Sequence, residues 1–423
     1  MTRIAKDAFR MNGVPACRQV LTTADTAVSD LSMYAQDFID ALTVPRTEAE
    51  AASGTYKPPT PPRMLMTGTY DEVQAFFEGD LSRFPDTATP IAWLTDGSCI
   101  VPPTEERVAK MLTGTSHSPD EIVREKYSPK ELWCTVEKVA VNAVMAGCKP
   151  EYLPVALTLA ESGCCRAYPG DTSVGSSWVV SGPIAKEIGM NSWFCMWAPG
   201  NPANTSLSRC ATLMGINLGG LEMGLTNPNR TGNNIWSLIY AEATDKSPWI
   251  GLNEDRGFGA DQSVLVPMGS TLMPYNRGAM NYPVKSLKEL QVSTPQIVVD
   301  SLKSNTHSSS GMVQFCPQTA WIWHDEYGFE TMQELKDYLW DNVTWTVGMW
   351  KEDYWVYGVY DKIKDRPRGE RIVSLDHWEM PDDAIIPLFT SPDSISIVVA
   401  GGDGDCWSWG GGGSGGYLID KWR

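Results

Sequence analysis

The sequence predicts an α/β protein, with a mixed or mostly parallel sheet core in two lobes and an N-terminal helical arm. Three observations lead to this prediction. Apolar residues make up 42% of the 423-residue chain and charged residues only 20%, so a substantial core can form. From residue 64 onward, helix-like and strand-like segments alternate, which is typical of a sheet with parallel strands. No repeat period is visible, so solenoids and propellers are not supported.

Residues 1–63 are predicted to form the arm and a linker. The segment SDLSMYAQDFIDAL has apolar residues at the i, i+3, i+4 and i+7 spacing of an amphipathic helix. KPPTPP, at 57–62, fits neither a helix interior nor a central strand, and it therefore predicts a semi-rigid linker. We expect the arm to pack either on a partner subunit of a homo-oligomer or back on its own domain.

Residues 64–260 contain most of the predicted alternation. YDEVQAFFEGDL predicts a helix, and IAWL and CIV are short apolar runs around a DG turn. Thr104 is placed to cap the next helix, with Glu105 and Glu106 in its first turn. ELWCTVEKVAVNAVMAGC predicts one helix that ends at Gly147, and its apolar stripe consists of Leu132, Val136, Val139, Ala140 and Ala143. YLPVALTLA, SSWVVSG and TLMGINLGG predict buried strands or helix–strand junctions.

Residues 261–423 are predicted to belong to the same globular unit, although their composition shifts. The segment 321–360 holds six Trp and five Tyr, which favours a packed aromatic core or a subunit interface over a ligand-stacking wall. SISIVVAGG, at 394–402, predicts a strand. The glycine-rich run after it is not followed by a helix, so we expect no nucleotide cofactor.

The net charge of −17 limits the classes of partner. A field of this sign repels phosphate backbones and anionic lipids, so we expect a small-molecule substrate and neither nucleic acid nor membrane as partner. No stretch approaches the roughly 20 apolar residues that span a bilayer. The first residues lack the apolar core of a secretory signal. These features predict a cytoplasmic protein.

Ten cysteines and four histidines restrict the metal and redox chemistry. No two cysteines form a CxxC pair, so reduced thiols, mostly buried, are expected. No histidines have HxH or HExxH spacing, so a His-rich metal centre is not expected. HDE, at 324–326, would place neighbouring side chains on opposite faces of an extended segment, which disfavours a metal site there. A metal bound by thiolates remains open.

A carboxylate and a thiol lie three residues apart in TDGSC. Asp96-Gly97 predicts first a turn, in which Asp96 caps and Gly97 takes a positive φ. The functional alternative is a site near a sheet edge, where α/β proteins bind ligands. There Asp96 would be a general base or a ligand, and Cys99 would be a nucleophile if its pKa were lowered.

The segment 132–152 holds a second group of candidates. Cys148 follows a predicted helix, whose C-terminal dipole does not stabilise a thiolate. It is either a structural thiol or a reactive one assisted by Lys149. Glu137, Lys138 and Asn142 form either a solvated helix face or the lining of a cleft.

Two later motifs are candidates for binding an anionic substrate. In APGNPANTSLSR, Asn201 belongs to a turn, and Asn204 or Thr205 is expected to cap the following helix, whose exposed amides would suit a carboxylate. In NEDRGF, Asp255 and Arg256 form either a structural ion pair or a bidentate anchor for a substrate carboxylate.

Five long motifs between about residues 64 and 260 carry a family resemblance: TDGSCIVPPTEERVAKMLTGTSHSPDEIV, TVEKVAVNAVMAGCKPEYLPV, SGPIAKEIGMNS, APGNPANTSLSR and SPWIGLNEDRGF. Together they resemble the UGSC family of selenocysteine- or cysteine-containing proteins, over a little under half of the chain. The resemblance implies redox chemistry. However, Asp96 stands where the selenocysteine would be, and a carboxylate cannot form a selenylsulfide or disulfide with Cys99. A local redox pair is therefore not expected.

The chain as a whole favours an enzyme, a lyase or hydrolase, that cleaves a bond in a small anionic or heteroatom-bearing organic substrate. Asp96 would move protons, and Cys99 or Cys148 would attack or ligate. Arg256 and the 200–205 turn would hold the substrate. Three alternatives stay open: a thiol oxidoreductase using Cys99 and Cys148, a metal-dependent enzyme with thiolate ligands, and a non-catalytic assembly protein.

Overall fold

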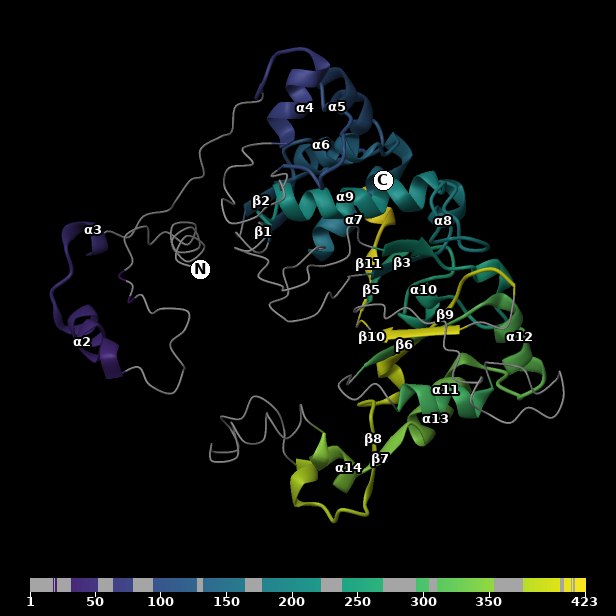
Figure 1. Cartoon of the computed structure of the whole chain (residues 1–423). Helices are drawn as coiled ribbons and strands as arrows, with labels where there is room; N and C mark the ends of the chain where they lie inside the picture. The colour runs from purple at the N-terminus through teal and green to yellow at the C-terminus, as the bar shows by residue number, and fades with distance from the viewer. Residues whose placement is uncertain are drawn as a thin grey trace.

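Figure 1 shows the computed structural model of the chain. It describes residues 18, 20, 32–51, 64–78, 94–127, 132–163, 177–221, 238–268, 294–303, 310–353, 376–403, 407–411, 413 and 415–423. The predicted linker KPPTPP, the IAWL run up to residue 93 and parts of the glycine-rich run lie outside these residues. In the described part, helices and mixed sheets form an α/β fold, which confirms the predicted class. No helix in these ranges is long and apolar enough to cross a bilayer.

The described N-terminal elements are η1 (Ser32–Tyr34), α2 (Ala35–Thr43) and α3 (Glu48–Ala51). The predicted amphipathic helix is therefore present as α2, and none of its residues is buried. Arg18 connects the two helices, because its guanidinium donates to the Glu50 carboxylate at 2.6 and 2.9 Å and to the carbonyl of Val44 at 2.8 Å.

A group of helices forms the upper part of Figure 1: α4 (Tyr70–Glu78), α5 (Glu105–Leu112), α6 (Val136–Ala146), α7 (Leu153–Ser162) and α9 (Pro202–Asn217). The short η3 (Pro150–Tyr152) precedes α7. Thr104 caps α5 through its side chain, as predicted, and Gly147 ends α6 with φ +82°. These helices contribute most of the largest apolar cluster, which Trp422 also joins.

Two sequence predictions in this region need correction. The helix expected from residue 131 begins only at Val136, because Leu132–Thr135 is a strand, β2, that pairs antiparallel with β1 (Ile122–Tyr127). The Thr135 side chain then accepts from the amide of Lys138 and caps α6. YLPVALTLA belongs mostly to a helix, α7, in which residues 153–160 are all buried. A fully buried helix loses the polar face on which its periodicity depends, so it resembles a buried strand in sequence.

The first main sheet has the strand order β11-β5-β3-β4. Its strands are β3 (Ser177–Ser181), β4 (Leu238–Ala241), β5 (Val264–Met268) and β11 (Tyr417–Leu418). β3 and β4 are parallel, whereas β5 is antiparallel to both β3 and β11. The short helices α8 (Ile184–Glu187), η4 (Thr244–Lys246) and α10 (Leu252–Asp255) follow the carboxyl ends of β3 and β4.

The second main sheet has the order β10-β6-β9. Its strands are β6 (Gly311–Phe315), β9 (Ile395–Val399) and β10 (Trp407–Gly411). β6 and β9 are parallel and β10 is antiparallel, so the predicted strand in SISIVVAGG is confirmed. The two sheets meet where the amide of Ala243, just past β4, donates to the carbonyl of Val399 at 2.8 Å.

Helices and a small ribbon occur in the same part of the chain as the second sheet. They are α11 (Pro295–Leu302), α12 (Pro317–Asp325), α13 (Met332–Asn342) and α14 (Val347–Glu352), with the antiparallel pair β7 (Thr344–Thr346) and β8 (Ile385–Pro387). The short η8 (Asp376–Glu379) and η9 (Pro392–Ser394) lie in the connections. Part of the aromatic-rich segment is core: the fully buried ring of Trp323 lies 4.8 Å from that of Phe315.

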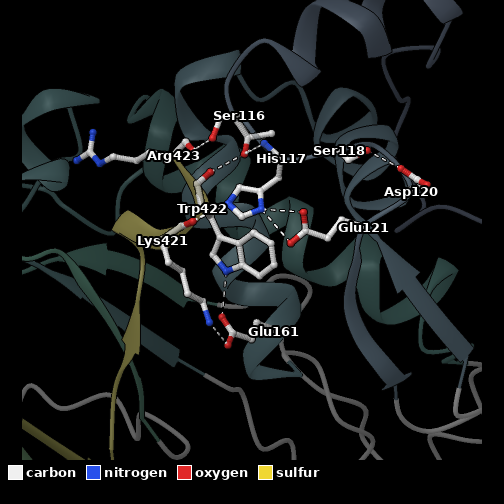
Figure 2. A network of polar contacts seen from close by, with 10 residues as sticks. Ser116, His117, Ser118, Asp120, Glu121, Glu161, Lys421, Trp422 and Arg423 are labelled. Carbon is white, nitrogen blue, oxygen red and sulfur yellow. Dashed lines mark hydrogen bonds and ion pairs between the residues drawn. The ribbon is translucent and has the colours of Figure 1, made fainter.

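Residues 420–423, which include η10 (Asp420–Trp422), lie against the 115–121 segment (Figure 2). The His117 ring is bonded on both sides: Nδ1 lies 2.9 Å from the Glu121 carboxylate and Nε2 lies 2.6 Å from the carbonyl of Lys421. The ring also lies 4.8 Å from that of Trp422. The last described residues are thereby fixed to the helical region.

Candidate functional site

The predicted turn at Asp96-Gly97 is present, and it holds a buried ion pair. Gly97 has φ +88°, and the amide of Ser98 donates to Asp96 Oδ1 at 3.2 Å. The Asp96 carboxylate, only 1% exposed, receives two bonds from Arg209 of α9, Nε to Oδ2 at 2.9 Å and Nη2 to Oδ1 at 3.0 Å. Because both oxygens are engaged, this geometry favours the turn interpretation of Asp96. Its role as a general base stays a prediction.

Arg209 also fixes the main chain that carries Cys99. Its Nη2 donates to the carbonyls of Ser98 at 3.1 Å and Cys99 at 2.7 Å, and the Cys99 thiol is free and exposed. Arg209 was not among the site residues predicted from the sequence. Its one signal was its position at the end of APGNPANTSLSR, as a single charge in a helix of small and apolar residues.

The candidates on α6 have mostly structural partners. Lys138 Nζ donates to the carbonyl of Trp133 at 3.0 Å. Asn142, 2% exposed, donates to the carbonyl of Lys138 and accepts from Asn217 Nδ2 at 2.9 Å, which joins α6 to α9. Glu137 is half-buried in the first turn of the helix. Asn142 therefore holds two helices together, and a cleft-lining role for α6 stays a prediction.

Cys148 is a free, half-buried thiol packed against the largest apolar cluster. The amide of Val101 donates to the carbonyl of Met145 at 3.2 Å, so the Cys99 segment runs beside the end of the helix that Cys148 follows. Of the other described cysteines, Cys134 is buried, and burial raises the pKa of its thiol to about 12. That thiol is not reactive at neutral pH.

The capping role expected of Asn204 or Thr205 is wrong. Helix α9 begins at Pro202, whose fixed φ suits a first helical position, and both residues lie inside the helix. Asn201 occupies the N-cap position, but its side chain does not cap. Its Nδ2 donates instead to the carbonyls of Cys195 at 2.8 Å and Ala198 at 2.9 Å.

The Asn201 amide belongs to a network that fixes the loop before α9. Asn191 Nδ2 donates to Asn201 Oδ1 at 2.8 Å, and Asn204 Nδ2 donates to the carbonyl of Asn191 at 2.8 Å. Cys195, in this loop, has φ +58°, a left-handed conformation that is rare for residues other than glycine. The three amides therefore hold a strained loop in place.

Asp255 and Arg256 lie together, as predicted, but the main partner of Asp255 is a third residue. Lys336 of α13, whose side chain is 3% exposed, forms an ion pair and hydrogen bond with Asp255 Oδ1. Arg256 Nη1 lies 3.7 Å from Asp255 Oδ2, and Arg256 Nη2 donates to the Ser396 hydroxyl and to the carbonyl of Gly413. Lys336 gave no signal in sequence, since it is one of several charged residues on an amphipathic helix.

Glu242, directly after β4, has the most strongly shifted carboxyl pKa in this region, and it was not predicted from the sequence. It is 4% exposed, and burial raises its pKa to about 7, helped by the negative charges of Asp255 and Glu254. Two hydrogen bonds to Oε2 oppose this shift, from the Ser181 hydroxyl at 2.5 Å and the amide of Leu252 at 2.9 Å. Its signal in sequence was an acid at the end of the apolar run LIYA.

Printed contacts join Lys336 to Asp255 and Arg256 to Asp255 and Ser396, and the charge of Asp255 acts on Glu242. With two polar side chains from the same sheet face as Ser396, these residues are called here the buried polar cluster: Glu242, Asp255, Arg256, Gln314, Lys336, Ser396 and Ser408. Gln314 and Ser408 are paired across β6 and β10, and Ser396 pairs with Met312 two residues earlier, so the three polar side chains share one face of the sheet. Five buried atoms of the cluster have no hydrogen-bond partner among the described residues: Glu242 Oε1, Asp255 Oδ2, Arg256 Nε, Gln314 Oε1 and Ser408 Oγ.

Neither a metal site nor a similar protein helps to assign a function to this cluster. Within the described ranges, no three His, Cys, Asp or Glu side chains are grouped so that they could hold a metal ion. No family model, curated protein or solved structure matches the chain. The resemblance to the UGSC family stays a prediction, and function has to be argued from the side chains themselves.

Proposed function

We propose that the protein is an enzyme, a hydrolase or lyase, that cleaves a bond in a small anionic organic substrate by general acid catalysis from Glu242. One observation carries this proposal: Glu242 is a buried carboxyl with a pKa of about 7 and an unpartnered oxygen. A proton donor is most effective when its pKa lies near the working pH. Strongly shifted carboxyl pKa values are concentrated at functional sites, which supports a catalytic role for Glu242.

The position of Glu242 supports the same conclusion. It lies at the carboxyl end of β4, one of two adjacent parallel strands, and ligands of α/β proteins bind outside such ends. Arg256 supplies a buried cation for the anionic group of the substrate, as the sequence predicted. The proton of Glu242 would go to the leaving-group atom. In hydrolysis, the attacking water would supply the hydroxyl group and the proton that restores Glu242.

This proposal moves proton transfer from Asp96, whose oxygens are bound by Arg209, to Glu242. Cys99 and Cys148 remain candidates for a nucleophile or for the thiol oxidoreductase alternative, because both thiols are free and their segments are neighbours. Three predictions from the sequence remain proposals: a small-molecule substrate, a homo-oligomer and a cytoplasmic location.

Glu242→Gln tests the proposed function. The wild-type protein would be incubated with small esters, thioesters, amides and β-hydroxy acids that carry a carboxylate, and product followed by proton NMR. We expect turnover that falls as pH rises above about 7, because the acid loses its proton. Glu242→Gln should lower kcat by about 10²–10⁴-fold.

Glu151→Gln is the matched control, since Glu151 is exposed and pairs only loosely with Lys149 at 3.9 Å. It should keep the wild-type rate. Wild-type turnover that survives in the folded Glu242→Gln variant, or no turnover across the panel, would contradict the proposal.

A further inference from the structure

Ser181 and Glu242 meet at the carboxyl edge of two parallel strands. Ser181 is the last residue of β3, and Glu242 directly follows β4. The pairing of Val180 with Ala241 places the next two residues side by side, and the amide of Glu242 donates to the carbonyl of Val180 at 2.9 Å. The Ser181 hydroxyl lies 2.5 Å from Glu242 Oε2, and both residues are buried. The pairing of the two strands therefore sets the distance between these side chains.

The Ser181 hydroxyl has one hydrogen and two acceptors within reach. Its Oγ lies 2.5 Å from Glu242 Oε2 and 3.0 Å from Asn253 Oδ1, and it accepts from the amide of Asn253 at 3.0 Å. The Asn253 side chain is itself fixed, because its Nδ2 donates to the carbonyls of Gly259 at 2.9 Å and Gln262 at 3.0 Å. A hydroxyl donates only once, and a short bond to a carboxylate is the stronger of the two. The hydrogen of Ser181 therefore goes to Glu242.

The two oxygens of Glu242 have different surroundings. Oε2 receives hydrogen bonds from the Ser181 hydroxyl and from the amide of Leu252, the latter at 2.9 Å. Oε1 is buried and has no hydrogen-bond partner among the described residues. Hydrogen bonds to a carboxylate stabilise its charged form and so oppose protonation of the oxygen that accepts them. The oxygen that takes and releases the proton is therefore Oε1.

We infer that Ser181 is a positioning residue of the proposed acid: its hydroxyl holds Glu242 Oε2 as the carbonyl oxygen and leaves Oε1 to carry the proton that reaches the substrate. The inference rests on the proposed function, because it assigns a role within the same acid catalysis. Proton transfer breaks the O–H bond at Oε1 and forms a bond from that hydrogen to the leaving-group atom, while the electron pair of the broken bond stays on the carboxylate. The negative charge is then shared with Oε2, where Ser181 and the amide of Leu252 stabilise it.

Several other groups also act on the protonation of Glu242. Burial is the largest cause of its raised pKa, and the hydrogen bond from Ser181 is the largest influence that lowers it. The charged and titratable groups around it are Asp255 and Glu254 of α10, Tyr240 of β4, and Lys336 and Arg256 beside Asp255. Loss of the Ser181 hydroxyl should therefore raise the pKa of Glu242 further.

Infrared difference spectroscopy of the intact wild-type protein tests which oxygen carries the proton. Spectra recorded between pH 6 and pH 9 should contain a carboxyl C=O band that Glu242→Gln lacks, with a midpoint at about pH 7. Because Oε2 accepts two hydrogen bonds, this band should lie at a lower frequency than that of a monomeric carboxylic acid in an apolar solvent. A band at the frequency of the free acid would overturn the inference, because it would place the proton on Oε2 and leave Oε1 as an unbonded carbonyl.

Ser181→Ala removes one of the two bonds to Oε2. The pKa of Glu242 should rise by about one unit, because a hydrogen bond to a carboxylate is stronger than one to a neutral carboxyl, and the band should move to higher frequency. Ser181→Cys keeps a weaker donor and should give smaller shifts in the same directions. Ser177→Ala, which removes another buried serine of β3, is the matched control and should change neither quantity.

An unchanged or lowered pKa of Glu242 in the folded Ser181→Ala variant would overturn the inference. If that variant did not fold, the wild-type band and Ser181→Cys would decide the question by the same criteria.

Kinetics with a turned-over panel substrate separates positioning from a purely structural role. In Ser181→Ala, the pH above which turnover falls should move up by about one unit with the pKa of Glu242. At pH 6, kcat should fall by up to about 10²-fold, because the acid is less precisely held. KM should change little, since the Ser181 hydroxyl makes its bonds within the protein.

The outcomes separate this inference from the proposed function. The expected infrared shifts without turnover of any panel substrate would support the assignment of the proton to Oε1 and contradict the enzyme. Turnover that depends on Glu242, with no change of band or pKa in Ser181→Ala, would support the enzyme and contradict the positioning role of Ser181.

Discussion

At the scale of single residues, the pair of Asp96 and Arg209 decides what the DGSC turn does. Both side chains are largely buried, and the guanidinium binds two carboxylate oxygens and two main-chain carbonyls. Removal of one partner of a buried pair leaves a charge without compensation, which costs about 3–5 kcal/mol. The turn that carries Cys99 should therefore depend on this pair.

Asp96→Asn and Arg209→Gln should each lower the free energy of unfolding by about 3–5 kcal/mol, measured by urea denaturation. The double variant should lose less than the sum of the two, because the two side chains act as one unit. Asp382→Asn is the control: Asp382 is 77% exposed in its pair with Lys351, and its loss should cost less than about 1 kcal/mol. Asp96→Asn at wild-type stability would contradict the structural role of this ion pair.

These residues also show which parts of the candidate site could be predicted from the sequence. The turn was predictable because an Asp-Gly pair has a strong local preference, and Asp255 with Arg256 was predictable because the two are adjacent. Their partners were not. Arg209 lies 113 residues from Asp96, and Lys336 lies 81 residues from Asp255. Pairing over such separations is set by the packing of helices, which one sequence does not contain.

At the scale of elements, structure set by local sequence signals was predicted correctly, whereas structure set by long-range strand pairing was not. Thr104, Gly147 and the amphipathic pattern of α2 act within a few residues, and each predicted its element correctly. The strand β2 was missed because Leu132–Thr135 continues the apolar stripe of α6, and only pairing with β1 makes it a strand. The order of strands in both sheets depends on the same kind of contact.

The attachment of residues 420–423 should depend on pH through His117. The oxygens beside its two ring nitrogens both accept, so only the doubly protonated ring satisfies both bonds. The Glu121 carboxylate raises the pKa of His117 above its usual 6.5, and the carbonyl of Lys421 adds to the shift against the effect of burial. The folded-state pKa is the higher one, so the stabilisation is complete below about 6.5 and is lost as pH rises through the folded-state pKa.

Hydrogen exchange of residues 417–423 measures this attachment, and we expect faster exchange at pH 8 than at pH 5.5 after correction for intrinsic rates. His117→Gln should exchange faster at low pH and lose most of the pH dependence. His377→Gln, at an exposed histidine of η8, should leave the profile unchanged. Protection that is equal in wild type and His117→Gln at every pH would rule out the histidine as the cause.

At the scale of the whole molecule, a few polar contacts connect elements of the two sheets. The hydrogen bond from Ala243 to Val399 joins the exit of β4 to β9, and Arg256, after α10, bonds to Ser396 of β9. Lys336 of α13, which packs on the second sheet, pairs with Asp255 of α10, which follows the first. The buried polar cluster is thus both the proposed site and part of the junction.

A double-mutant cycle on Lys336 and Asp255 tests that junction. Lys336→Met preserves volume but leaves Asp255 with only the distant guanidinium of Arg256, and Asp255→Asn leaves a buried ammonium. Each should lower the free energy of unfolding by about 3–5 kcal/mol, and the double variant by clearly less than the sum. Lys149→Met, at an exposed pair with Glu151, should change the free energy of unfolding by less than about 1 kcal/mol.

If the pair of Lys336 and Asp255 couples the two sheets, denaturation of the wild type should be one transition, whereas Lys336→Met should separate it into two. A single transition at wild-type stability would show that apolar packing alone joins them.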